Sequence, residues 1–458
     1  MFKRETYVQR RDALKKAVGT GLLLFMGNDE AGCNFEDNLY PYRQDSTFLY
    51  YFGLPYAGLM AVIDIDENRE IIFGDELTID AIVWMGVQPT LHEKSEAAGI
   101  KDVRPLAELK AYLEAAMRKG QPVRYLPTYR PEHRLKLLSL LGLMPGTEQP
   151  SVEFIKAVVN MRNHKTDEEI AEIDKACNVT ADMHLRAHEM VQPGRRECEV
   201  AAAVQEVAAA HNYMLSFPTI ATVHGETLHN HDHSNVIRSG QLFLLDAGAE
   251  TEMGYAGDMS STIPVDKKFT PRQKEMFEIQ MASHEAAVKA LRPGIRFEEV
   301  YDLSAEVIVE GLKGAGLMKG DAKEAVKAGA HALFFPHGLG HMMGMDVHDM
   351  ENLGEAYVGY GDQPKSKQFG RKSLRLAREL EPGFVLTIEP GIYFIPQLID
   401  MWHAEKRFAD FINYDKVVTY KDFGGIRNEE DYLITADGAR LLGKKFLCHA
   451  DELEKRRG

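Results

Sequence analysis

The chain has 458 residues, enough for two domains, and its apolar and charged fractions of 45% and 27% are those of ordinary globular proteins. It carries 54 Lys and Arg against 69 Asp and Glu, a net charge of -15. Because nucleic acids and anionic membranes are bound through basic surfaces, this charge argues against both as partners.

The cysteines and the N-terminus indicate a compartment. The four cysteines form no close pair, so we expect no disulfide framework and a reducing environment. The first segment, MFKRETYVQRRDALKKAV, is charged and lacks the apolar core of a signal peptide. The apolar run GLLLFM (21–26) is too short to span a membrane and fits a buried strand. We therefore expect a cytoplasmic protein.

Residues 1–160 are predicted to form an α/β domain. Its pattern indicates strands at 21–26, 59–64 and 70–73 and helices at 107–118 and 131–141. We interpret PYRQDSTFLYYFGL (41–54) as a core strand with polar ends rather than a substrate contact. Pro and Gly cluster at 143–152, as in linkers, so a second domain is expected to cover 161–458.

The second domain contains a repeated sequence motif, an internal echo of eight residues. PGRRECEV (193–200) and PGIRFEEV (293–300) share Pro, Gly, Arg, Glu and Val in register, one hundred residues apart. Each follows a long predicted helix, one opened by a capping box at Thr166 and the other by Thr270 before a proline. The echo favours a duplicated half-domain, which would enclose a site between its halves.

A predicted hairpin between the two helical units carries two aspartates. If its turn centres on Glu252, Asp246 and Asp258 face each other at a Cβ separation of ~5 Å. Two carboxylates at that separation repel unless they are protonated or bridged by cations. The hairpin therefore suggests a metal site.

The segment HGLGHMMGMDVHD (337–349) holds three histidines, His337, His341 and His348. Imidazole suits both metal binding and proton transfer, and the intervening glycines give the backbone freedom to aim several rings at one point.

Two predicted strands near the C-terminus add carboxylates. The first, at 384–393, carries Glu389, and the second, at 424–435, should turn Arg427, Glu429 and Asp431 inward and Glu430 toward solvent. The polar, basic segment 355–380 before them is expected to be a solvated excursion.

The inward candidates form one donor set. They are Asp246, Asp258, His341, Glu389 and Glu429. Four carboxylates and one imidazole suit hard divalent ions such as Mn²⁺, and they fit two ions ~3.5–4 Å apart better than one.

The order Asp, Asp, His, Glu, Glu, within the motifs DAG, HGLGH, EPG and GIRxE, resembles the pita-bread metallopeptidases over residues 165–440. The most similar branch comprises aminopeptidase P and prolidase, which cut bonds to proline. The resemblance implies an α/β pita-bread domain with pseudo-two-fold halves, preceded by a smaller α/β domain of the aminopeptidase P N-terminal type. It also implies two divalent ions, Mn²⁺ or else Co²⁺ or Zn²⁺.

Residue roles follow from the same resemblance. Asp246 would chelate one ion, Asp258 and Glu429 would bridge, and His341 and Glu389 would hold the other. A hydroxide bridging the ions would attack the carbonyl before proline, Glu389 would take a proton, and a protonated histidine would assist the leaving nitrogen. The matching substrate residues are His229, His337, His348 and Tyr393, and Arg427 would orient carboxylates. His231 and His233 lie beside His229 and leave its assignment open.

The choice within the branch rests on the first domain. Trp84, in VWMG, is similar to an aminopeptidase P tryptophan that crosses into a neighbouring subunit's site, which implies a homodimer or homotetramer. We therefore expect an aminopeptidase acting on peptides with an Xaa-Pro N-terminus. The alternatives are a prolidase and, more remotely, a non-catalytic peptide-binding module.

Overall fold

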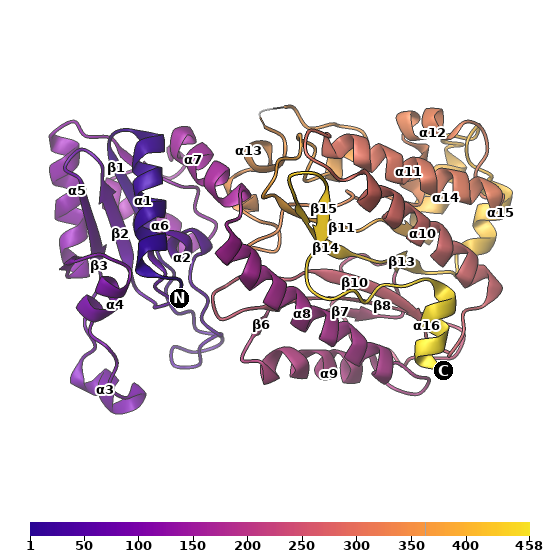
Figure 1. Cartoon of the computed structure of the whole chain (residues 1–458), viewed down its shortest axis with the longest axis horizontal. Coiled ribbons are helices and arrows are strands. Elements are labelled where there is room, and N and C mark those ends of the chain that lie inside the picture. Colours follow the sequence, from indigo (N-terminus) through magenta and orange to yellow (C-terminus); the bar gives the residue numbers. More distant parts are fainter. Residues whose placement is uncertain (362) are drawn as a thin grey trace. The chain divides into compact units, whose positions relative to one another are not determined.

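The computed structural model describes residues 1–361 and 363–458, which form two compact units (Figure 1). The first unit is Met1–Arg162 with Asn352–Gly354, and the second is Asn163–Glu351 with Glu355–Gly458. The predicted boundary at 160/161 lies next to this division. No helix among the described residues is both long and apolar enough to cross a membrane.

The N-terminal unit is built on a five-stranded sheet in the order β4-β3-β2-β1-β5. Its strands are β1 (Leu22–Met26), β2 (Met60–Asp64), β3 (Arg69–Phe73), β4 (Asp102–Arg104) and β5 (Val123–Tyr125). Its helices are α1 (Arg4–Val18), α2 (Ser46–Phe52), α3 (Ile79–Met85), α4 (Leu91–Ala97), α5 (Leu109–Arg118), α6 (Pro131–Leu141) and α7 (Val152–Asn163). The strands predicted at 21–26, 59–64 and 70–73 and the helices predicted at 107–118 and 131–141 are confirmed.

The strand predicted within residues 41–54 is wrong, because Ser46–Phe52 is helix α2. Asp45 caps its first turn by accepting a hydrogen bond from the Phe48 backbone N–H, and Gly53 ends it in the left-handed conformation. All seven helical residues are buried, so the helix shows no polar face. An apolar run of this length does not distinguish a buried helix from a buried strand, and the two caps decide it here.

The larger unit contains two long helix pairs and several short sheets. Its helices are α8 (Asp167–Met190), α9 (Glu197–Ala210), α10 (Pro271–Ala290), α11 (Phe297–Gly314), α12 (Ala322–Ala328), α13 (Glu355–Gly359), α14 (Pro396–Ala404), α15 (Tyr414–Val417) and α16 (Ala450–Arg457). Its strands are β6 (Met214–Leu215), β7 (Ile220–Thr222), β8 (Leu242–Ala247), β9 (Ala249–Glu250), β10 (Met259–Pro264), β11 (Val385–Ile388), β12 (Gly391–Tyr393), β13 (Gly425–Arg427), β14 (Glu430–Ile434) and β15 (Ala439–Leu441). Helix α8 packs on β8 and β10, and α10 packs on β11, β12 and β13.

The repeated motifs at 193–200 and 293–300 form equivalent turns in two repeated halves of the larger unit. Gly194 and Gly294 both have a positive φ, 93° and 83°, and each precedes the second helix of its pair. The Gly194 N–H donates to Ile237 O at 2.9 Å, and the Gly294 N–H donates to Leu380 O at 2.9 Å. The expected duplication is therefore confirmed, and each half pairs two helices with a sheet.

Candidate metal centre

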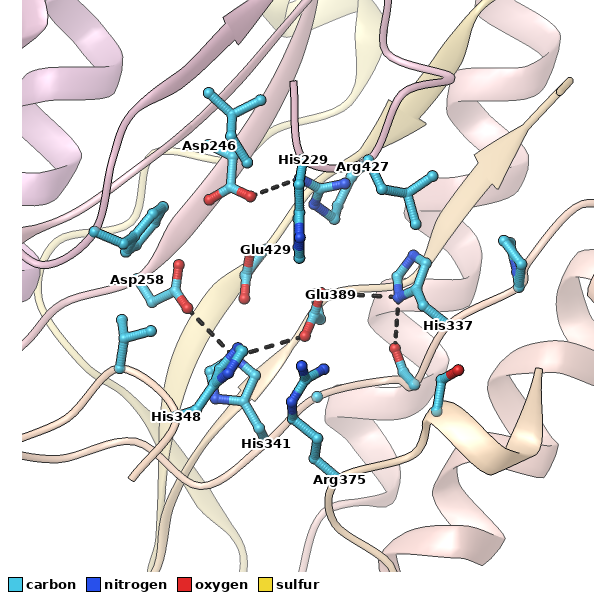
Figure 2. A pocket seen from close by; sticks show the side chains of 18 of the residues that line it. His229, Asp246, Asp258, His337, His341, His348, Arg375, Glu389, Arg427 and Glu429 are labelled. Atoms are coloured by element: carbon cyan, nitrogen blue, oxygen red, sulfur yellow. Dashed lines mark hydrogen bonds and ion pairs between the residues drawn. The ribbon is translucent and has the colours of Figure 1, made fainter. Parts of the chain in front are cut away.

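A pocket of about 760 Å³ opens in the larger unit (Figure 2). All five predicted ligands line it, together with His229, His337, His348 and Arg427. The lining of the pocket also includes His231, Glu355, Lys365, Lys372 and Arg375.

The two aspartates come from the β8–β10 hairpin, but its register differs from the prediction. Asp246 pairs with Ser260, not with Asp258, because the turn is centred one residue later than Glu252. Asp258 precedes β10 and lies diagonally from Asp246. The shift is two residues along one strand, and side chains alternate with a period of two, so both carboxylates still face the same side.

The histidine segment lies alongside β11. The Thr387 N–H donates to His341 O at 3.0 Å, and the Glu389 N–H donates to Leu339 O at 2.8 Å. A Cβ at position 340 would collide with Thr387 O, so this close approach requires Gly340. Backbone pairing thus brings His341 and Glu389 to one edge of the pocket.

Four ligands converge on one point. His341 Nε2 lies 3.3 Å from Asp258 Oδ2 and 3.7 Å from Glu389 Oε1. Ligand atoms of Asp258, His341 and Glu429 all lie within 4.8 Å of one another. Glu429 reaches the cluster because its backbone N–H donates to Ser260 O at 2.9 Å, joining the segment between β13 and β14 to the hairpin.

Arg427 joins the fifth ligand to this group. Its Nη2 donates to Asp246 Oδ2 at 2.5 Å, and its Nε donates to Ser260 Oγ at 3.0 Å. The Ser260 hydroxyl in turn donates to Glu429 Oε2 at 2.7 Å. Arg427 therefore orients two carboxylates, one directly and one through Ser260. Ser260 was not predicted from the sequence, although its place two residues after Asp258 was the available signal.

The donor set fits divalent ions. Asp246 Oδ1 is buried and has no hydrogen-bond partner among the described residues, as expected of an atom reserved for a cation. Burial raises the pKa of Asp258 and of Glu429 well above the usual carboxyl range, and neighbouring carboxylates add to the effect. Burial also raises the pKa of Glu389 to about 7. Bound cations would offset the repulsion among these groups and stabilise their charged forms.

The remaining histidines flank the cluster. His337 Nδ1 lies 3.9 Å from Glu389 Oε2, and its Nε2 accepts from the Tyr393 hydroxyl at 2.8 Å. Glu351 Oε2 accepts from His348 Nδ1 at 2.6 Å, which leaves Nε2 as the ring nitrogen that can contact a ligand. Burial lowers the pKa of His337 to about 3 and that of His348 to about 4. Burial thus favours the neutral form of both rings.

Several predicted residues are placed elsewhere. Tyr393 is fully buried behind the pocket, between His337 and Arg427, rather than in its lining. Trp84 lies in α3 of the N-terminal unit, where it is 87% exposed. His229 and His231 both line the pocket, whereas His233 hydrogen-bonds to Thr219 O.

Two expectations about the C-terminal acids are wrong. Glu430 is buried, not solvated, and its carboxylate accepts from the Tyr432 hydroxyl at 2.8 Å. Asp431 faces inward but away from the pocket, where it accepts from the Asp258 backbone N–H at 3.0 Å and from Cys177 Sγ at 3.1 Å. The strand is interrupted at 428–429, between β13 and β14, so simple alternation along 424–435 does not hold.

The described residues of the segment 355–380 do not form a solvated excursion, and Asp362 lies outside the described residues. It includes helix α13, and Leu374, Leu376 and Ala377 are buried. Its charged side chains Glu355, Lys365, Lys372 and Arg375 line the pocket. Buried apolar residues spaced between the basic ones anchor the segment, so these four charged side chains form part of the pocket wall.

These features define the class of the protein as a metal-dependent hydrolase. The model of metallopeptidase family M24 matches residues 171–436, and that of the aminopeptidase P N-terminal domain matches residues 7–125. The chain belongs to metallopeptidase family M24.

Known relatives cover nearly the whole chain. The Xaa-Pro aminopeptidase of Escherichia coli is 31% identical over 99% of this chain and 97% of its own length. The human Xaa-Pro dipeptidase is 30% identical over 93% of this chain and 87% of its own. The structure of E. coli aminopeptidase P with the inhibitor Pro-Leu superposes with a TM-score of 0.82 at 30% identity, covering 100% of this chain and 98% of that one. The fold expected from the resemblance is confirmed.

Proposed function

We propose that this protein is an Xaa-Pro aminopeptidase that uses two divalent ions to release the N-terminal residue from peptides with proline in second position. The observation that carries the proposal is the convergence of the five ligands in one pocket. The full-length similarity to the E. coli enzyme supports the substrate class. Retention of the whole ligand set argues against a non-catalytic peptide-binding module.

Bound metal ions and protein side chains would each contribute to hydrolysis of the peptide bond. Divalent ions held by these residues would polarise the scissile carbonyl and lower the pKa of the attacking water. Mn²⁺ suits the four carboxylates and single imidazole, and Co²⁺ or Zn²⁺ are the alternatives. Asp246 would hold one ion, His341 and Glu389 the other, with Asp258 and Glu429 shared.

Glu389 would transfer a proton from the attacking water to the leaving group. Its carboxyl group lines the pocket beside His341, so it would accept a proton from the attacking water and then donate it to the proline nitrogen. The neutral histidines at the pocket edge would act as hydrogen-bonding groups: His348 through Nε2, and His229 on the proline side. In this proposal Glu389 protonates the leaving group, a role that was expected of a histidine from the sequence.

The cationic wall of the pocket is compatible with both an aminopeptidase and a prolidase. Lys365, Lys372 and Arg375 could bind the carboxylate of a short peptide, which favours small substrates and keeps Xaa-Pro dipeptides as the second candidate. The deciding assay compares an Xaa-Pro-Yaa tripeptide with an Xaa-Pro dipeptide on Mn²⁺-loaded protein. Release of Xaa from the tripeptide supports the proposal, and cleavage of the dipeptide alone would reassign the activity to a prolidase.

We also propose a homodimer or homotetramer. Helix α3 and its flank expose Ile79, Val83, Trp84, Met85 and Val87 by 56–87%. An exposed apolar group of this kind is typical of a protein interface, and a second copy of this chain is the proposed occupant. Light scattering should give a multiple of the 51.5 kDa chain mass, and Trp84→Ser should shift it toward the monomer.

The proposed location is the cytoplasm. All four cysteines are free, which suits a reducing compartment. Fractionation with an epitope-tagged chain tests this directly, and recovery outside the cytoplasm would contradict it.

A further inference from the structure

The last residue of the histidine segment forms a buried ion pair. Asp349 Oδ2 lies 2.8 Å from Lys165 Nζ, just before α8, and each side chain is 1% exposed. Neither residue lines the pocket of the metal centre. Removing two charges from water is costly, and a buried ion pair is weak evidence of added stability. Its position relative to the ligands is therefore more informative than its contribution to folding.

Asp349 is connected to the metal ligand His341 through a single carbonyl oxygen. Met342 O accepts from the Asp349 backbone N–H at 2.9 Å and from His341 Nδ1 at 3.1 Å. The second bond places the imidazole proton on Nδ1 and leaves the Nε2 lone pair facing Asp258 and Glu389. A hydrogen bond from the non-ligating nitrogen is the usual way in which a protein fixes the tautomer and orientation of a ligating histidine.

The ion pair also contacts the turn between the histidines. A Cβ at Gly344 would lie 2.6 Å from Asp349 Oδ2 and 2.9 Å from Lys165 Cε, so the backbone packs directly on the pair. Gly344 O accepts from the Ala256 N–H at 2.9 Å, two residues before Asp258.

The Lys165 backbone extends these connections to the strand that precedes Glu389. The Lys165 N–H donates to Gly383 O at 2.9 Å, shortly before β11. The pair therefore lies where the histidine segment, the aspartate hairpin and β11 meet. The first two segments supply predicted ligands, and Glu389 directly follows β11.

We propose that Lys165 and Asp349 are positioning residues that hold the segment 341–349 so that His341 presents Nε2 to the metal ions and His348 reaches the pocket edge. The Asp349 carboxylate fixes the C-terminal end of the segment, and the Lys165 ammonium fixes the carboxylate. This inference deepens the proposed function and rests on the same metal centre.

Calorimetric titration of metal-free protein with Mn²⁺ tests the proposal without peptidase activity. Asp349→Asn and Lys165→Met should each weaken binding by about 10- to 100-fold, the usual effect of losing a group that supports a metal ligand. The matched control is Ile308→Ala, a fully buried residue of α11, whose truncation destabilises a core to a comparable degree. The control should lose resistance to urea while binding Mn²⁺ as the parent does.

A second variant keeps both charges. Gly344→Ala should push against the ion pair and weaken Mn²⁺ binding even though no hydrogen-bonding group is removed. It therefore tests the positioning role if Lys165→Met does not fold. Parental Mn²⁺ affinity in folded Asp349→Asn and in Gly344→Ala would overturn the inference. The proposed function fails by a different result, in which the parent binds Mn²⁺ but leaves Xaa-Pro peptides intact.

Discussion

Arg427 donates a 2.5 Å hydrogen bond to Asp246 Oδ2, while the other carboxylate oxygen of Asp246 is buried and has no partner in the part of the chain that the structure describes. The guanidinium holds the carboxylate by one oxygen and leaves the second available to a cation. This division explains how a buried arginine can lie among metal ligands without occupying the metal position.

Replacing Arg427 should loosen the metal site. We expect Arg427→Gln to weaken Mn²⁺ binding by about 10- to 100-fold, because Asp246 and Ser260 both lose a charged donor. Calorimetry measures this, with Arg440→Gln as the control, since Arg440 forms an exposed ion pair with Asp174. Parental affinity in Arg427→Gln would show that the ligands hold their positions without it.

Tyr393 should act through its neighbours. Its hydroxyl donates to His337 Nε2 and accepts from Arg427 Nη1 at 2.9 Å. Tyr393→Phe leaves both groups unpaired, so we expect a lower kcat, an unchanged KM and a loss of about 1–3 kcal/mol in the free energy of unfolding. Tyr414→Phe, which removes a hydroxyl bonded to Arg407 O, is the control for kcat. A raised KM with parental kcat would instead place Tyr393 against the substrate.

Arg375 should recognise a free carboxylate. Loss of a charged hydrogen bond costs about 1.5–3 kcal/mol, so Arg375→Gln should raise the KM for a short peptide acid by roughly tenfold or more. Arg375 Nε also lies 3.5 Å from Glu351 Oε1, and Glu351 bonds to His348. The corresponding peptide amide should show little change, which separates carboxylate binding from indirect effects through Glu351. Arg378→Gln is the matched control, because Arg378 belongs to the same segment but does not line the pocket. Equal effects on acid and amide would contradict the assignment.

Buried neutral histidines should make the fold sensitive to acid. Burial lowers the pKa of His184 and His284 to about 4, and that of His188 and His331 to about 3. Unfolded histidines titrate near pH 6.5, so between about pH 6.5 and 4 the unfolded chain binds protons that the folded chain does not. The free energy of unfolding is unaffected by these histidines above this pH window, and it decreases as the pH falls through the window.

Urea unfolding at pH 7 and pH 5 measures this dependence. His284→Leu should reduce the difference between the two pH values, by up to about 1.4 kcal/mol for each pH unit in the window. His211→Gln, at an exposed position, should leave the difference unchanged. Equal pH dependence in His284→Leu and the parent would contradict the prediction.

The candidate ligands could be located from the sequence because each lies in a short motif with its own signal. Asp246 and Asp258 lie on one predicted hairpin, and an even register shift preserves the face of both side chains. An odd shift would have placed one of them outside the pocket. The correct prediction therefore depended on parity and not on the exact pairing.

Other features depended on tertiary contacts that no local pattern encodes. Glu430 reads as a solvated edge residue, but Tyr432 supplies a buried donor for it. The segment 355–380 reads as a polar excursion because its apolar anchors are spaced irregularly among basic residues. Tyr393 was predicted to bind substrate, whereas its fully buried position follows from the β12–β13 pairing with Arg427 nearby.

The most direct test of the central claim combines metal binding and turnover in Asp258→Asn. Mn²⁺ stoichiometry and cleavage of an Xaa-Pro-Yaa tripeptide are measured on one preparation, with the exposed Asp437→Asn as the control. We predict that Asp258→Asn loses the second ion and turnover together, whereas the control retains both. Full tripeptide cleavage in folded Asp258→Asn would contradict the assignment of this cluster as the catalytic metal centre.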